Sequence, residues 1–203
     1  MDGNAMEFVL AVCLGIGLSA ACGFRVFVPL LGVNLAVQAG HLNLAEGFDW
    51  IGSPVACAVF ATATVLEIGA YYVPWIDNLL DSIATPAAVV AGTVITAALV
   101  KDMSPMLQWT LAAIAGGGTA AVVQTGTVAL RGASSATTAG LGNFVVSTGE
   151  LGLSSVTTVL AMLLPITIAI AVIFGVAALL TYLLGRFSSR STTAEQPAKV
   201  GVR

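Results

Sequence analysis

Residues Phe8–Leu31 read FVLAVCLGIGLSAACGFRVFVPLL and contain a single charged side chain, Arg25. A helix that crosses a bilayer needs about 20 mostly apolar residues, because it rises about 1.5 Å per residue through a hydrocarbon core about 30 Å thick. The apolar run around this stretch, residues 7–37, is longer than one such crossing. Because Gly23, Arg25 and Pro29 interrupt it, we expect the helix to break near Arg25.

The composition of the whole chain points to a membrane as its surroundings. Of the 203 residues, 58% are hydrophobic and only 8% are charged, whereas a soluble domain carries about 25% charged residues. So few charges cannot coat a water-soluble surface, and we expect lipid to surround much of the protein. The apolar residues form continuous runs and not alternating segments, which argues against a membrane β-barrel. We therefore predict an all-α, polytopic membrane helix bundle.

Four further stretches are candidates for crossing the membrane, which gives about five spans with broken or re-entrant segments. They cover residues 53–73, 84–100, 106–130 and 153–184, the last with Pro165 inside it. We expect residues 1–187 to form one transmembrane helical domain and residues 188–203 to form a flexible cytoplasmic tail.

Small residues recur at helical spacing and predict close packing between helices. Two sets share one helix face each: Gly15, Ser19 and Gly23, and Ala112, Gly116 and Ala120. Small side chains at this spacing let helix backbones approach closely in lipid. The segment from Arg131 to Glu150 is rich in Gly, Ser and Thr, and we expect it to be a polar loop. It is either an ordinary loop outside the membrane or a segment that lines a water-filled cavity.

The positions of Lys and Arg predict the orientation in a bacterial inner membrane. With five spans, Lys101 and the basic tail (Arg186, Arg190, Lys199 and Arg203) fall on one side and Arg131 falls on the other. Because Lys and Arg favour the cytoplasmic side, the C-terminus is expected in the cytoplasm and the N-terminus outside. The first charges, Asp2 and Glu7, are acidic, which argues against a cleaved signal peptide.

Two charged residues lie deep inside apolar stretches, where hydrocarbon cannot solvate them. Arg25 at the helix break suits an anionic group, and the alternatives are a structural ion pair or a side chain that reaches the headgroups. Glu67 lies in the second apolar stretch and is the plainest partner for Arg25. Without a partner, Glu67 could carry a proton.

The segment VPWIDNLLDSIATP, residues 73–86, places Asp77 and Asp81 one helical turn apart. It predicts a short amphipathic helix in the interface or re-entering the membrane, with Tyr71, Tyr72 and Trp75 as interfacial anchors. The two carboxylates either are solvated or hold a hard cation.

Glu150 is expected to begin the last helix, near a cap formed by Ser147 or Thr148, with ion coordination as the second interpretation.

The sequence lacks the usual signs of catalysis, of a metal or cofactor, and of nucleic-acid binding. It has no nucleophile elbow, P-loop, HExxH motif or dinucleotide fingerprint. Three separate cysteines (Cys13, Cys22 and Cys57) and one histidine offer almost no zinc ligands. A net charge of -3 gives nucleic-acid binding no electrostatic basis. We expect neither an enzyme nor a cofactor.

Taken together, these features resemble a bacterial membrane-protein family known as domain of unknown function 4126. The resemblance rests on SAACGFRVFVPLL (Ser19–Leu31), on Glu67 and the VPWIDNLLDSIATP segment, on GGGTAA through Arg131, and on GLGNFVVSTGE ending at Glu150. It covers about residues 8–184 and implies a small polytopic membrane protein without an established activity. It also implies that Arg25, Glu67, Asp77, Asp81 and Glu150 belong to one constellation.

The functional expectation is a transporter- or channel-like protein for a small solute or ion. The broken first helix and the 131–150 segment would line a cavity, to which Gly23, Asn143 and Ser147 would contribute. The alternative is a non-catalytic scaffold that organises lipids or partner helices. Expected partners are the bilayer and a second copy of the chain. The likeness of FVLAVCLGIGLSAA, from Phe8, to WTLAAIAGGGTAAV, from Trp109, suggests a two-repeat design.

Overall fold

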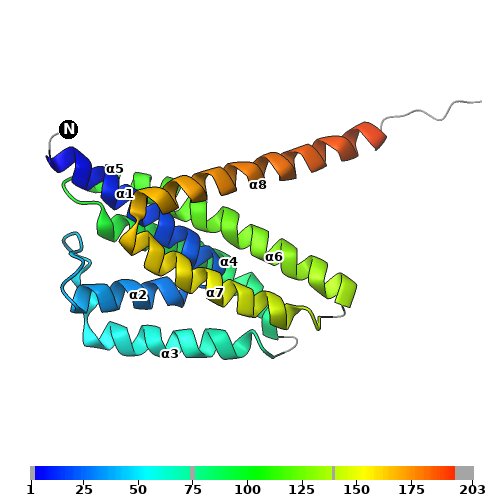
Figure 1. Ribbon diagram of the computed structural model, residues 1–203, viewed down its shortest axis with the longest axis horizontal. Helices are drawn as coiled ribbons and strands as arrows, with labels where there is room; N and C mark the ends of the chain where they lie inside the picture. Colours follow the sequence, from blue (N-terminus) through cyan, green and yellow to red (C-terminus); the bar gives the residue numbers. More distant parts are fainter. Residues whose placement is uncertain (1–2, 74–75, 139, 195–203) are drawn as a thin grey trace, which may run out of the picture.

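The computed structural model describes residues 3–73, 76–138 and 140–194, and the side chains of residues 77, 78 and 183–194 are outside this description. The described chain is helical, and its helices run roughly along one axis (Figure 1). The elements are α1 (Gly3–Phe24), α2 (Phe27–Gln38), η1 (Asp49–Gly52), α3 (Pro54–Ala70), α4 (Ile76–Leu99), α5 (Pro105–Leu111), η2 (Ala112–Gly117), α6 (Gly118–Thr138), α7 (Asn143–Leu163) and α8 (Pro165–Ala194).

Within the described residues, five helices are long and apolar enough to cross a membrane. They are α1, α4 from Leu79 onward, the continuous 105–138 helix made of α5, η2 and α6, then α7, and α8 up to Tyr182. The prediction of an all-α bundle with about five spans is therefore confirmed. The break predicted near Arg25 is also confirmed, because α1 ends at Phe24 and α2 begins at Phe27.

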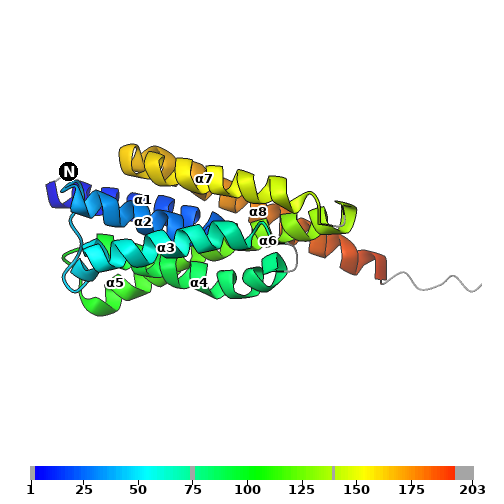
Figure 2. The same cartoon turned by 90° about the horizontal axis from the view of Figure 1, so that it is seen from below.

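The assignment of the spans differs from the prediction in two places. The 153–184 stretch is not one span, because Pro165 lacks the N–H that would continue the helix and α8 begins there in a new direction. The second stretch forms α3, which has only 17 residues and packs against the 12-residue α2. These two shorter apolar helices lie along the lower edge of the bundle in Figure 1, and Figure 2 views the bundle from that side.

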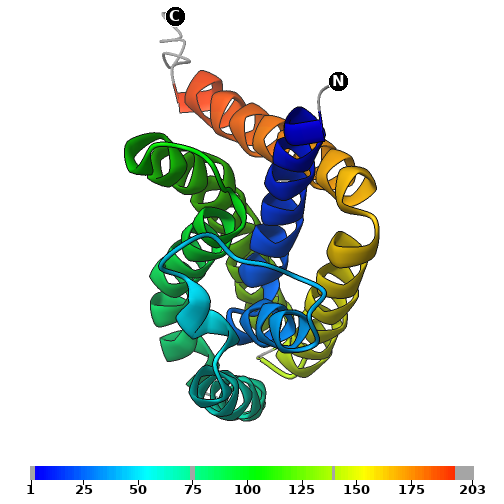
Figure 3. The ribbon, with the colours of Figure 1, turned by 90° about the vertical axis from the view of Figure 1, so that its left-hand side faces the viewer.

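Helix α1 is the centre of the bundle and packs against α4, α6, α7 and α8. Viewed along the bundle, it lies between the green helices α4–α6 and the yellow and orange helices α7 and α8 (Figure 3). The predicted small-residue faces make these contacts. A Cβ added at Gly23 would lie 2.6 Å from the Cβ of Val123, and one added at Gly15 would lie 3.0 Å from Thr96. Backbones this close leave no room for larger side chains.

The prediction of a polar loop over residues 131–150 is wrong. Helix α6 continues to Thr138 and α7 begins at Asn143, with Gly140 at a φ of 89° in the turn between them. A left-handed φ of this kind is readily adopted by glycine. The Ser and Thr residues of this region satisfy their hydroxyl groups within the helices, as Thr138 does with the carbonyl of Ser134 at 2.8 Å.

The segment with Asp77 and Asp81 is likewise not a separate amphipathic helix. It forms the beginning of α4, which continues through Pro86 to Leu99. The proposed anchor Trp75 lies outside the described residues, as does the side chain of Asp77.

The placement of Lys101 on the side of the basic tail is also wrong. Lys101 and Asp102 line a cavity together with Asn4 near the N-terminus and with Pro165 at the start of α8. Three membrane-crossing helices follow Lys101, because Pro165 divides the last apolar stretch into two. The far end of α8 therefore lies at the opposite end of the bundle from Lys101 (Figure 1). The C-terminal half of α6, which contains Arg131, also lies toward that opposite end.

Candidate functional site

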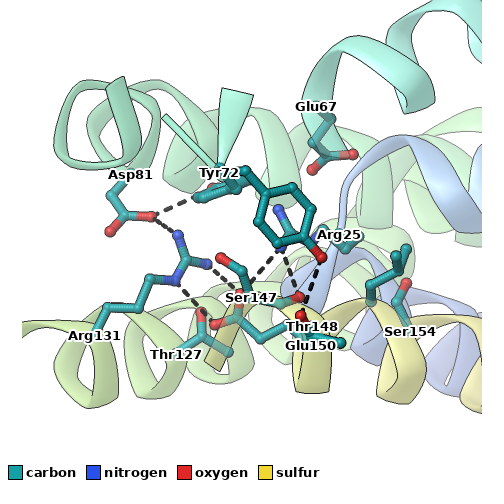
Figure 4. A network of polar contacts seen from close by, with 12 residues as sticks. Arg25, Glu67, Tyr72, Asp81, Thr127, Arg131, Ser147, Thr148, Glu150 and Ser154 are labelled. Carbon is teal, nitrogen blue, oxygen red and sulfur yellow. Dashed lines mark hydrogen bonds and ion pairs between the residues drawn. The ribbon is translucent and has the colours of Figure 1, made fainter. Parts of the chain in front are cut away.

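Four charged side chains from four parts of the chain meet inside the bundle (Figure 4). Arg25 comes from the break between α1 and α2, Asp81 from α4, Arg131 from α6 and Glu150 from α7. We call these four residues the charge cluster. Arg25 and both side chains of the Arg131–Glu150 pair are 1–3% exposed, and Asp81 is 12% exposed. Charges buried at this depth need partners within the protein.

Arg131 uses all three of its side-chain nitrogens in the cluster. Its Nε donates to Oε1 of Glu150 at 3.0 Å, and its Nη2 donates to Oε2 at 2.7 Å. Its Nη1 donates a short hydrogen bond to Oδ1 of Asp81. The two parallel bonds to Glu150 match the flat guanidinium fork to a carboxylate, which is a strong and directional arrangement.

Arg25 is less completely paired than Arg131. Its Nη2 donates to the backbone oxygen of Ser147 at 2.9 Å and lies 3.7 Å from Oε2 of Glu150. No described residue accepts a hydrogen bond from its Nε or Nη1, although the residue is only 1% exposed. Two buried donors without acceptors are unusual in a folded protein.

Tyr71, just after α3, joins the two arginines. The guanidinium carbons of Arg25 and Arg131 lie 3.9 and 4.1 Å from the centroid of its ring, and its hydroxyl donates to Oδ1 of Asp81 at 3.3 Å. A ring face attracts cations, and more strongly where water is excluded. Tyr71 is 4% exposed, so its predicted role as an interfacial anchor is wrong.

Glu67 lies beside the charge cluster but does not form the predicted ion pair with Arg25. Its Oε1 accepts the backbone N–H of Val26 at 2.9 Å, and its Oε2 accepts that of Phe27 at 3.1 Å. These N–H groups are among those that the start of α2 leaves without partners inside the helix. The carboxylate thus caps α2 from another helix, and the ion-pair partner of Arg25 is Glu150.

The interior face of α7 is a buried polar stripe. It consists of Asn143, Ser147, Glu150, Ser154 and Thr158, three or four residues apart. Ser154 donates to the carbonyl of Ala21 at 3.0 Å, which joins α7 to α1. Glu150 is therefore seven residues inside α7 and is not at its N-terminus, so the capping role predicted for it, with Ser147 or Thr148 as the cap, is wrong.

Of the predicted site residues, the structure brings together Arg25, Asp81 and Glu150, with Glu67 adjacent. Ser147 contacts Arg25 through its backbone, and Asn143 lies farther along the same face of α7. Gly23 packs against α6. The Asp77 side chain is outside the described residues.

The sequence interpretation missed Arg131, Tyr71 and Gln124 as site residues. Gln124, Thr127 and Arg131 are buried along one face of α6, at spacings of three and four residues. That periodicity was the available signal, but the small polar residues after Arg131 favoured a loop. The Nε2 of buried Gln124 has no hydrogen-bond acceptor among the described residues.

The cluster is formally neutral, since it contains two arginines and two carboxylates. Within the described part of the chain, no three His, Cys, Asp or Glu side chains come together as a metal site. The arrangement is suited to recognising a charged or hydrogen-bonding group.

Comparison with known proteins identifies a family whose function is unknown. No curated protein and no solved structure matches the chain. The model of one family matches residues 12–185, which include both arginines and all the acidic residues of the site. The chain therefore belongs to the family described as domain of unknown function (DUF4126), as the resemblance implied.

Proposed function

We propose that this polytopic membrane protein is a transporter- or channel-like protein for a small solute or ion, with the charge cluster and Glu67 at its intramembrane site. The observation that carries the proposal is the incomplete pairing of Arg25. Its Nε and Nη1 lack acceptors among the described residues, although it sits at a helix break and is 1% exposed. Broken helices at membrane depth are where many transporters bind their substrates.

The energetic cost of this arrangement supports a functional role. A charged side chain at the centre of a membrane helix costs about 2.5–3.5 kcal/mol on insertion scales. Leaving a buried donor without an acceptor costs about 1–3 kcal/mol more. A purely structural arginine would gain stability by completing its pairing, as Arg131 does. A ligand or water that meets Arg25 would recover this energy.

The distribution of Lys and Arg supports an orientation in the cytoplasmic membrane. Four of the seven lie at the C-terminal end of the sequence, from Arg186 onward, two are buried in the charge cluster, and Lys101 lies at the end of the bundle near the N-terminus. By the positive-inside rule, the tail end faces the cytoplasm and the Lys101 end faces outward. The proposal contains no catalytic step.

Proteoliposomes test transport across a panel of solutes. Light scattering records the swelling of vesicles in iso-osmotic solutions of small neutral solutes and of the salts of small acids. We expect the wild-type protein to accelerate swelling for at least one of them, and Arg25→Met or Glu67→Gln to lower that rate about tenfold or more. Glu46→Gln, in an exposed loop, is the matched control and should keep the wild-type rate. Full flux in both folded site variants would refute the assignment.

The second candidate is the non-transporting scaffold, and the complete pairing of Arg131 favours it. Every side-chain nitrogen of Arg131 is bound by Glu150 or Asp81, as in an ion pair that only joins helices. A scaffold predicts that replacing the whole charge cluster, as Arg25→Met, Asp81→Leu, Arg131→Met and Glu150→Leu together, keeps the helices associated, because apolar residues can replace a complete structural ion network at little cost. Transport through the cluster predicts that this quadruple variant folds but supports no flux.

A further inference from the structure

We infer that the N-terminus of α2, together with Arg25, is a binding site for a small carboxylate, and that Glu67 fills this site from within the protein until an incoming carboxylate displaces it. The inference names the ligand class for the site of the proposed function and rests on that function for its use in transport. Binding itself is tested separately.

The core of the site is a pair of backbone N–H groups. The N–H groups of Val26 and Phe27 donate to the two oxygens of Glu67, at 2.9 and 3.1 Å. Helix N-termini favour anions because their N–H groups are unpaired and the helix dipole is positive there. Glu67 belongs to another helix, α3, so its side chain can leave while the N–H groups of Val26 and Phe27 keep their positions at the start of α2.

A second, independent observation is the pair of buried Arg25 donors that lack hydrogen-bond acceptors. This residue directly precedes the two N–H groups, and no described residue accepts from its Nε or Nη1. Figure 4 shows its guanidinium between Glu67 and the Glu150 side of the charge cluster. The site therefore offers more donors than Glu67 uses. Glu67 forms no ion pair with Arg25, so an incoming carboxylate that binds these donors must lie closer to Arg25 than the Glu67 carboxylate does.

The geometry and the charge favour a carboxylate over other anions. Two N–H groups that each take a different oxygen of one group fit a flat, two-oxygen acceptor. A halide ion is a single acceptor atom, so the two N–H groups would have to share it. The charge cluster is formally neutral, so the site holds one negative charge at present, that of Glu67. A phosphate dianion would double that charge in a region poor in water.

When an incoming carboxylate displaces Glu67, the Glu67 side chain remains in the protein. The negative charge of the region therefore stays constant only if Glu67 takes up a proton. One carboxylate enters, one proton binds to a carboxyl oxygen of Glu67, and no covalent bond in the ligand changes. Among the described residues, the titratable groups that interact electrostatically with Glu67 are Arg25 at the helix break, Arg131 on α6 and Cys22 on α1. One bound proton per carboxylate predicts that the apparent affinity rises as the pH falls, by up to tenfold per pH unit.

The test uses the purified full chain in detergent, and it measures thermal stabilisation by sodium acetate and by sodium dodecanoate at pH 6, 7 and 8. Sodium chloride and sodium phosphate at equal ionic strength are the reference anions. We expect the wild type to be stabilised by at least one carboxylate, more strongly at pH 6 than at pH 8, and not by the reference anions. Stabilisation by acetate identifies a water-soluble acid as the ligand, and stabilisation by dodecanoate alone identifies a fatty acid from the membrane.

Variants separate the residues of the site. Glu67→Gln removes the internal competitor, so we expect its apparent affinity for the carboxylate at pH 8 to exceed that of the wild type at least tenfold and to lose its pH dependence. Arg25→Met should lose binding, whereas Glu46→Gln and Lys101→Met, both at exposed positions, should behave as the wild type. The wild-type titration tests the proposal even if a site variant fails to fold.

Two results would overturn the inference: a wild type that no carboxylate stabilises between pH 6 and 8, or equal stabilisation by chloride and carboxylate. The swelling assay distinguishes this failure from failure of the proposed function. Carboxylate binding without any flux supports the site and refutes transport. Flux of a neutral solute without carboxylate binding supports transport and refutes the site.

Discussion

Arg131 and Glu150 form the closest two-point contact in the charge cluster, with hydrogen bonds of 3.0 and 2.7 Å between side chains that are both 3% exposed. Removing one member of a buried ion pair leaves the other charge without compensation, which costs about 3–5 kcal/mol. We therefore expect Glu150→Gln to lower the free energy of unfolding by about 3 kcal/mol, measured by reversible unfolding in mixed detergent micelles. Glu46→Gln should change it by less than about 0.5 kcal/mol. Equal stability of the two variants would contradict a structural contribution of this pair.

Tyr71 contributes both a ring and a hydroxyl to the cluster, and two substitutions separate them. Tyr71→Phe keeps the ring near both guanidinium groups and loses one hydrogen bond of 3.3 Å, which costs about 1 kcal/mol. Tyr71→Leu also loses the ring, and each desolvated cation–π contact is worth up to about 2 kcal/mol. The same unfolding assay should place the Leu variant at least about 2 kcal/mol below the Phe variant. If the two are equally stable, the ring contacts carry no stabilisation.

At the residue scale, the sequence predicted which buried charges need a partner inside the protein, but it did not predict which residues form the ion pairs. The cost of burying charge singles out Arg25 and Glu67 without any structure, whereas Glu150 was expected at a helix end. Partner choice depends on how helices distant in sequence are arranged, so Glu150 and not Glu67 pairs with Arg25. Arg131 was missed because a Gly, Ser and Thr-rich segment is a poor helix in water, whereas a membrane forces the backbone to satisfy its own hydrogen bonds.

At the element scale, close contact between helix backbones holds the site in place. Gly23 lies two residues before Arg25 and against α6, where a Cβ would come within 2.6 Å of Val123 and 2.8 Å of the carbonyl of Ala120. Overpacking of this kind costs about 1–3 kcal/mol. We expect Gly23→Ala to lower the free energy of unfolding by that amount. It should also weaken any ligand binding at Arg25, since α1 and α6 must separate.

Gly149 is a matched control for Gly23, because it lies inside α7 with no atom within 4 Å of the Cβ position. Alanine there removes chain entropy from the unfolded state without a clash, so Gly149→Ala should be neutral or stabilising by up to about 1 kcal/mol. If both variants are destabilised alike, helix propensity and not backbone contact explains the effect.

Element boundaries were predictable where a chemical constraint fixes them. Arg25 and Pro29 marked the break between α1 and α2, and the small-residue faces of α1 and of the 105–138 helix correctly predicted close packing. Proline alone was ambiguous: Pro165 begins a helix, whereas Pro86 lies inside α4, which continues through it. A proline in the interior of a membrane helix is tolerated when neighbouring groups satisfy the freed carbonyl, and the sequence does not contain that information.

At the scale of the whole molecule, the helix order is compatible with the two-repeat prediction. The two similar segments lie in α1 and in the continuous 105–138 helix (α5, η2 and α6), which run in the same direction (Figure 1), and α1 packs against both η2 and α6. Each is followed by two helices of alternating direction, α2 and α3 in one case and α7 and α8 in the other, with α4 between the two sets. Parallel repeats of this kind are related by an axis along the membrane normal. The repeat stays a prediction, because the sequence likeness is weak.

The orientation of the whole molecule in the membrane can be tested by labelling cysteines introduced at its two ends. The 44–47 loop and Lys101 line one cavity at the N-terminal end, whereas Leu141 lies in the exposed turn between α6 and α7, one membrane crossing away. In a chain whose Cys13, Cys22 and Cys57 are replaced by alanine, a membrane-impermeant maleimide should label Glu46→Cys in intact cells. It should label Leu141→Cys only after the membrane is opened. The reason is that the tail end carries four of the seven Lys and Arg residues, which hold that end in the cytoplasm. The reverse labelling pattern would place the charge cluster toward the outer face and invert the direction from which a ligand reaches Arg25.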